Sequence, residues 1–128
     1  MNMQNTDMIC AKYGSKIAIK LNKSDESLVN KSLEVLQEEG VYAFFLFLAT
    51  QAKDEKNTPA YCIQKDIFDL LKVFFQSIKD SQEDILKIVR NNLAEDLNNL
   101  FLARDIIERT LVYARYHLKA KPKTQEAQ

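Results

Sequence analysis

The chain has 128 residues, a length that suits one domain with a single hydrophobic core. It contains only two Gly and two Pro, too little turn chemistry for a β-sandwich or a barrel. Lys plus Arg and Asp plus Glu both number 18, so the net charge of zero excludes a protein that binds nucleic acid through its overall charge. The longest apolar run, residues 41–49, is too short to cross a bilayer, and residues 1–7 lack the charged and apolar regions of a signal peptide. We therefore expect no membrane segment. Cys10 and Cys62 form no CxxC motif, and two such cysteines predict a reduced, cytoplasmic protein.

The first helix is predicted from Asp7 or Met8 to Leu21. Gly14 weakens this prediction, because Gly in a helix interior costs about 1 kcal/mol relative to Ala. A strand over residues 16–21 is the alternative, since these residues partly alternate, but no second strand-like segment could pair with it. The helix is therefore preferred, and its inward positions are Cys10, Tyr13, Ile17 and Leu21.

The second helix is predicted to begin at Asn22 or Ser24 and to end at Glu39, where Gly40 supplies the C-terminal stop. Its inward positions are Val29, Leu33 and Leu36. Residues 41–51 form a helix that is apolar on all sides and is expected in the middle of the bundle. Its aromatic side chains could form a ligand pocket or an RNA-stacking platform, but core packing is the preferred interpretation. These aromatic residues are Tyr42, Phe44, Phe45 and Phe47.

The second half of the chain begins with a polar loop at residues 53–59. Three more helices are predicted, over residues 60–79, from residues 80–83 to residues 91–92, and over residues 93–120. Residues 1–7 and 121–128 are expected to be disordered tails, and residues 8–120 to be the bundle. The predicted fold is therefore all-α, a single-domain bundle of about six helices.

The final helix carries two apolar stripes and contains neither Gly nor Pro. Such a wide apolar surface predicts a helix that is buried on more than one side, with other helices packed around it. The first stripe consists of Leu97, Leu100, Phe101, Ile107, Leu111, Ala114 and Leu118, and the second of Ala103, Ile106, Thr110 and Tyr113.

The charges are segregated along the chain, although they sum to zero. Lys12, Lys16 and Lys20 fall on one line of the first helix, and Arg115 and Lys119 lie in the last turns of the final helix. The acids gather instead in the predicted second helix. A solvated lysine face, and cations placed favourably at a helix C-terminus, would explain both basic segments structurally. The functional alternative is that the first and last helices pack together, so that these five residues form one nucleic-acid-facing surface.

No cofactor or metal site is expected. Two distant glycines cannot form a phosphate-cradling loop, and a single His without a His/Cys cluster argues against a zinc site. Asp66 and Asp69 have a helical spacing that could bring two carboxylates together. We interpret both as solvated surface acids whose ordinary partners are Lys65, Lys72 and water.

One enzymatic alternative is a ribonuclease or toxin of the HEPN class. These small all-α domains use an Arg and a His on one helix, with a spacer of about four to six residues. Here seven residues separate Arg109 from His117, and only one separates Arg115 from His117. Neither spacing fits, so we expect no catalytic residues and no enzyme activity.

Residues 103–119 are similar to the closing helix of the small α-helical subunit of type III-B CRISPR effector (Cmr) complexes. That helix ends in an aromatic, a basic and another aromatic residue, and Tyr113, Arg115 and Tyr116 correspond to them. Gly40 followed by an apolar helix, and a first helix with a basic stripe and Tyr13, also resemble the family. The similarity spans residues 8–120, but the chain lacks a Pro before Gly40 and a Trp in the last helix.

The resemblance implies a non-catalytic subunit of an RNA-guided antiviral complex. Its expected partners are other CRISPR effector subunits, copies of itself, and the backbone of the guide RNA and the target RNA. Such subunits stack along the duplex and contact phosphate and sugar, while base pairing carries the sequence information. The RNA-binding residues would be Lys12, Lys16, Lys20, Arg115 and Lys119. A helical protein–protein adaptor is the alternative, because it would have the same sequence features.

Overall fold

The computed structural model describes residues 3–75, 78, 84–93 and 96–122. Over these residues the protein is an all-α bundle with six α-helices and no strand, as predicted. A 3-10 turn at Lys23–Asp25 precedes the second helix, and a π turn at Val89–Leu93 continues the fifth. The helices are α1 (Met3–Lys20), α2 (Glu26–Glu39), α3 (Val41–Ala52), α4 (Pro59–Phe74), α6 (Ile85–Ile88) and α7 (Leu97–Ala120).

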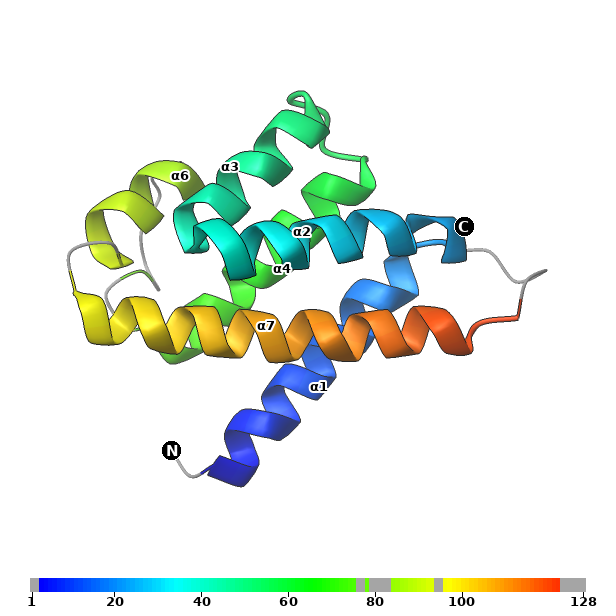
Figure 1. The fold of residues 1–128 in the computed structure, drawn as a ribbon, viewed down its shortest axis with the longest axis horizontal. Coiled ribbons are helices and arrows are strands. Elements are labelled where there is room, and N and C mark those ends of the chain that lie inside the picture. Colours follow the sequence, from blue (N-terminus) through cyan, green and yellow to red (C-terminus); the bar gives the residue numbers. More distant parts are fainter. Residues whose placement is uncertain (1–2, 76–77, 79–83, 94–95, 123–128) are drawn as a thin grey trace.

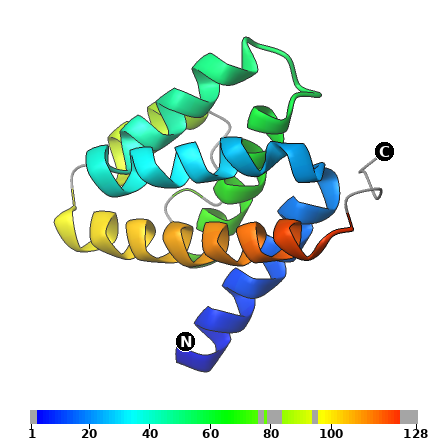
Figure 2. The same cartoon turned by 45° about the vertical axis from the view of Figure 1, so that its right-hand side comes forward.

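Helix α7 is the longest element, and other helices pack on two of its sides. Helix α2 runs antiparallel beside it, and α1 and α4 cross behind these two helices (Figures 1 and 2). The most extensive helix–helix contact joins α1 to α7, and α2 also packs on α7. Helix α3 packs against α2 and α4, which places it away from α7 at the top of Figure 1. The expectation that the final helix is buried on more than one side is therefore confirmed.

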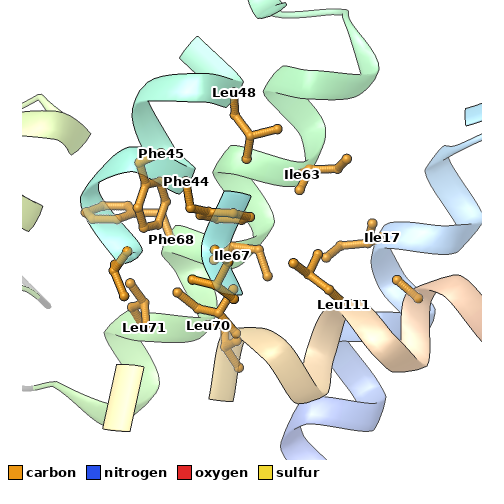
Figure 3. Close-up of a cluster of buried hydrophobic side chains, with 14 of the residues drawn as sticks. Ile17, Phe44, Phe45, Leu48, Ile63, Ile67, Phe68, Leu70, Leu71 and Leu111 are labelled. Carbon is orange, nitrogen blue, oxygen red and sulfur yellow. The ribbon is translucent and has the colours of Figure 1, made fainter. Parts of the chain in front are cut away.

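The core is centred on the contact between α3 and α4. Phe44 and Phe45 are fully buried, and their rings meet edge to face with centroids 5.2 Å apart. Phe45 makes a similar contact with Phe68 of α4, at 6.5 Å. Figure 3 shows these rings, with Ile17 of α1 and Leu111 of α7 at the far side of the cluster. The aromatic residues of α3 thus pack the core, as preferred from the sequence.

Local chemistry explains where several helices begin and end. Gly40 ends α2 with φ 103°, a conformation that suits Gly, and its N–H donates to the carbonyls of Leu36 and Val35. The Thr58 hydroxyl accepts the Tyr61 N–H at 3.2 Å and caps α4. The Asp96 carboxylate accepts the N–H groups of Asn98, at 3.0 Å, and of Asn99, at 3.3 Å, and caps α7. The predicted stop at Gly40 is therefore confirmed.

At Gly14, the backbone of α1 lies close against α7. A Cβ atom at this position would lie 2.6 Å from the Cβ of Tyr113 and 2.8 Å from the carbonyl oxygen of Thr110. From the sequence alone, Gly14 only weakens the predicted helix. The structure shows its use: without a side chain, the two backbones can pack together.

Several predicted boundaries differ from the structure. Helix α1 begins at Met3, so residues 3–7 are helical and not a disordered tail. Helix α4 ends at Phe74, before the predicted Lys79, which lies outside the described residues together with the predicted helix start at residues 80–83. The final helix begins at Leu97 and not at residue 93.

The apolar stripe predicted for the final helix is wrong at its N-terminal end. Leu97 and Phe101 are 62% and 57% exposed, and their neighbour Leu102 is 43% exposed. From Ala103 onward the two stripes are buried or half-buried, because α1 and α2 cover this part of the helix. In the described part of the chain, no helix has the length and apolarity needed to cross a membrane.

Candidate nucleic-acid interface

Helices α1 and α7 pack together, yet the five cations predicted to bind RNA are divided between two sites. Lys16 and Lys20 of α1 extend toward Asp66 of α4. Lys119 of α7 extends toward Glu26 of α2, and Arg115 lines a groove on the same side. The structure therefore gives two separate groups. Lys16 and Lys20 face α4, whereas Arg115 and Lys119 face α2.

Asp66 is the centre of the first group, and its interpretation as a solvated acid is wrong. Its side chain is 1% exposed, and the Lys20 ammonium donates to both carboxylate oxygens at 3.0 Å. The Lys16 ammonium lies 3.9 Å from the same carboxylate. The carboxylate is buried because α1 packs directly on α4 at this point, and burial of an ion requires a partner.

Helix α4 adds two lysines that the sequence analysis did not assign to the interface. The Lys65 ammonium donates to both oxygens of Asp69 at 2.9 Å, and the Lys72 ammonium lies 3.9 Å from Asp69. The hydrogen bond to Asp69 raises the pKa of Lys65. Asp69 is therefore paired as predicted, but its partners share the α1–α4 side of the molecule with the lysines around Asp66.

Tyr13 shows that the two ion-pair clusters are close neighbours. Burial raises the pKa of Tyr13, the charges of Asp69 and Asp66 raise it further, and Lys65 lowers it. The Lys16 ammonium lies 5.3 Å from the centroid of the Tyr13 ring. The α1–α4 side therefore carries four paired ammonium groups, and Lys12 stands one turn before Lys16 on the same line of α1. We call these five residues the lysine face: Lys12, Lys16, Lys20, Lys65 and Lys72.

The lysine face has a positive outer surface despite its two acids. Five ammonium groups stand against the carboxylates of Asp66 and Asp69, which are 1% and 25% exposed. The four paired lysines expose between 33% and 46% of their side chains. Lys12 is exposed and has no ion-pair partner among the described residues. The acids thus lie beneath the cations, and a ligand would meet ammonium groups first.

The second group lies in a groove between α2 and α7, which we call the α2–α7 groove. It has a volume of about 540 Å³ and is lined by Asn30, Leu33, Glu34, Gln37, Arg115, Tyr116 and Lys119. The Lys119 ammonium lies 2.8 Å from the Glu26 carboxylate, and this hydrogen bond lowers the pKa of Glu26. The Arg115 guanidinium carbon lies 5.8 Å from the centroid of the Tyr116 ring, which is 61% exposed.

Two further lysines have structural roles at helix ends. The Lys121 ammonium donates to the carbonyls of Ala18, at 2.7 Å, and of Leu21, at the end of α1. The Lys23 ammonium donates to the carbonyls of Lys119 and Lys121, both at 2.9 Å, at the end of α7. Thus Lys121, which follows α7, caps the C-terminal end of α1, and Lys23, which follows α1, caps the C-terminal end of α7. The helix macrodipole favours cations at both places. Lys121 therefore lies within the ordered bundle, although residues 121–128 were predicted to be a disordered tail.

Arg109 and His117 do not form a common site. Arg109 contacts Asp105 at 3.2 Å and Asp7 of α1 at 4.0 Å, whereas His117 is exposed. Eight residues along one helix separate the two backbones by about 12 Å. The Tyr113 hydroxyl donates to Asp7 at 2.8 Å, so this region serves the contact between α1 and α7. The hydrogen bond to Asp7 and burial raise the pKa of Tyr113.

Cys10 and Cys62 are free thiols, and burial raises the pKa of both. Within the described ranges, no group of three or more His, Cys, Asp or Glu side chains could hold a metal ion. No protein-family model matches the chain, and comparisons with curated proteins and with solved structures found no significant similarity.

Proposed function

We propose that this protein is a non-catalytic helical subunit of an RNA-guided complex, in which it contacts the backbone of the guide–target RNA duplex. The lysine face is the observation that carries the proposal, because four of its ammonium groups lie over acids that are buried or half-buried and the fifth, Lys12, is exposed. The similarity of the final helix to the small subunit of type III CRISPR effector complexes supports the kind of complex. Its partners would be larger CRISPR subunits and further copies of the chain.

The chemistry of the lysine face suits phosphate and not bases. Ammonium groups on long flexible side chains act as point charges and read no base edges. Each phosphate that they neutralise releases bound counterions, so the affinity falls as the salt concentration rises. Sequence recognition would then belong to base pairing between guide and target, and the subunit would hold the duplex in place. Arg115 and Lys119 would provide a second contact on the side of the α2–α7 groove.

The test of this proposal must spare the residues that hold the fold. Replacing Lys16 or Lys20 by Glu would place like charge against the buried Asp66 carboxylate and would damage the bundle. The informative variant is therefore Lys12→Glu, Lys65→Glu and Lys72→Glu together, because the Asp69 carboxylate that loses its partners is 25% exposed and stays in contact with solvent, unlike Asp66. A control with the same change in net charge is Lys31→Glu, Lys53→Glu and Lys56→Glu, which lies outside the lysine face.

We expect the lysine-face variant to lose RNA retention in the assembled complex, while the control retains it. The slope of a plot of log affinity against log salt concentration should decrease in magnitude by about one for each phosphate contact that is removed. Equal retention by the two variants at every salt concentration would refute the assignment of this surface. Purification of the tagged chain from its native host should recover RNA and larger CRISPR subunits.

A helical protein–protein adaptor is the second candidate, and one observation favours it. Leu97, Phe101 and Leu102 are exposed together at the start of α7, where an apolar partner surface could cover them. Recovery of the chain from its host with a protein partner, but without RNA or any CRISPR subunit, would favour this function over the first.

A further inference from the structure

The α2–α7 groove combines three features that the lysine face lacks. Tyr116 presents an aromatic ring that is 61% exposed, although it lies beside a guanidinium group. Leu33 of α2, which is 5% exposed, adds an apolar surface to the lining. Asn30 and Gln37 add amide groups from the same helix, and the Gln37 NH2 group already donates to Glu108 at 2.7 Å, which leaves its side-chain oxygen as the acceptor for a ligand. An aromatic ring, a cation and amides around about 540 Å³ are typical of a pocket for a small planar ligand.

Arg115 is the cation of the groove that remains available to a ligand. Lys119 is paired with Glu26, and Glu34 with Lys31. Among the described residues no carboxylate lies within ion-pair distance of Arg115, and its Nε is buried without a hydrogen-bond partner. A buried donor without an acceptor is unfavourable. An anion in the groove that draws the guanidinium outward would give Nε a partner, and planar guanidinium groups bind phosphate through two parallel N–H donors.

We propose that the α2–α7 groove binds one unpaired nucleotide of an RNA strand, with its base stacked on Tyr116 and its phosphate bound by Arg115. The polar edge of the base would face the amide of Asn30 and the side-chain oxygen of Gln37. Aromatic side chains stack on any base, so the site would accept different nucleotides. That the strand belongs to a guide–target complex rests on the proposed function, whereas nucleotide binding by the groove does not.

An acidic peptide is the other ligand that Arg115 could bind, and the geometry favours it less. A carboxylate would use the guanidinium but would leave the exposed ring of Tyr116 without a stacking partner. A nucleotide carries a flat π-face together with its anion, and it therefore matches both groups at once.

The proposal can be tested by NMR titration of the isotope-labelled chain with AMP, with ribose 5-phosphate, and with a short oligoadenylate. AMP should shift the Arg115 Nε–H and Tyr116 ring resonances, and ribose 5-phosphate should bind more weakly because it has no base. Tyr116→Ala should weaken AMP binding roughly tenfold, which is within the range of base–aromatic stacking, whereas Tyr116→Phe should retain it. Because Tyr116 is exposed, neither variant should disturb the fold.

The lysine-face variant separates this proposal from the proposed function. It should bind AMP like the unmodified protein, because no lysine of that face lines the groove. The oligoadenylate should bind more tightly than AMP, and equal affinities would assign the groove to a free nucleotide and overturn the RNA strand as its ligand. Unchanged Tyr116 and Arg115 resonances with AMP, or shifts only with an acidic peptide, would overturn nucleotide binding altogether. Either result leaves the salt-dependent test of the lysine face intact.

Discussion

The ion pair between Lys20 and Asp66 connects the stability of the bundle with its surface charge. An unpartnered carboxylate at 1% exposure would be strongly unfavourable, so Asp66 requires the ammonium group that α1 supplies. Lys20 in turn keeps its outer side in solvent, where it contributes to the lysine face. The same residue therefore joins α1 to α4 and adds positive charge to the surface.

Lys20→Met should lower the free energy of unfolding by about 1–3 kcal/mol, because it leaves the buried Asp66 carboxylate without its closest partner. Lys16, at 3.9 Å, can move toward the carboxylate and keep the loss within this range. The matched control is Lys12→Met on the same line of α1, which should change stability by no more than about 0.5 kcal/mol. Urea denaturation of the three proteins measures both values. Equal midpoints for the two variants would show that the ion pair contributes nothing to stability.

The sequence could not reveal the burial of Asp66. Asp66 and Asp69 lie three residues apart on one helix, so helical periodicity places both on the same side of α4. Only the crossing of α1 over α4 distinguishes them, and that crossing depends on tertiary packing. The exposure of Leu97 and Phe101 was not predicted for a related reason. An apolar stripe predicts a buried face, but it does not show where the covering helix ends.

At the level of whole helices, the sequence predicted what local chemistry controls. Gly40 ends α2, and the aromatic residues of α3 enter the core, because backbone conformation and apolar density act within one segment. The N-terminal start of α1 was missed because Met3 to Asp7 gain their order from α7, through the hydrogen bond between Tyr113 and Asp7. The lysine face was predicted only in part, since Lys65 and Lys72 join it through the packing of α4 on α1.

Gly14→Ala should destabilise the protein, although Ala favours helices. The added methyl group would meet the Cβ of Tyr113, the carbonyl of Thr110 and the backbone nitrogen of Ala114, none of which can rotate away. Overpacking of this kind costs about 1–3 kcal/mol, and it exceeds or offsets a gain in helix propensity of about 1 kcal/mol. We therefore expect a lower melting temperature and unfolding free energy.

The control for this prediction is Ser15→Ala, which makes a similar change at the next position of α1 without the close approach to α7. It should leave stability unchanged or raise it slightly through helix propensity. If Gly14→Ala stabilised the protein as much as Ser15→Ala does, the close packing of α1 on α7 at this point would be wrong.

Across the whole molecule, the two signs of charge lie in different layers. Helix α2 lies in the front layer of Figure 1 and exposes Glu34, Glu38 and Glu39, whereas α1 and α4, which carry the lysine face, lie behind. Some charges are neutralised within the bundle, as in the pair between Lys119 and Glu26. Glu38 and Glu39 have no ion-pair partner among the described residues, and they remain available to a second molecule.

This arrangement predicts head-to-tail association, in which the acidic end of α2 in one copy meets the lysine face of the next. Such a contact does not close into a dimer but propagates, as repeated copies along an RNA duplex would require. Because exposed ion pairs are weak and screened by salt, we expect a monomer at physiological salt and measurable association only at low salt. Sedimentation velocity at the two salt concentrations would detect it.

A charge-exchange experiment makes this prediction specific to the two surfaces. Glu38→Lys with Glu39→Lys gives one variant, and Lys65→Glu with Lys72→Glu gives the other. Each alone carries like charges on both surfaces and should remain monomeric at low salt, but their mixture should associate because every contact between unlike copies is then complementary. Moving the second pair of reversals to Lys53 and Lys56 gives a control with the same net charge, but this control keeps both original surfaces and should therefore associate on its own at low salt. Association that requires both variants of the first mixture, together with self-association of the control, would assign the contact to α2 and the lysine face. A Lys65 and Lys72 variant that self-associates as strongly as the control would refute that assignment.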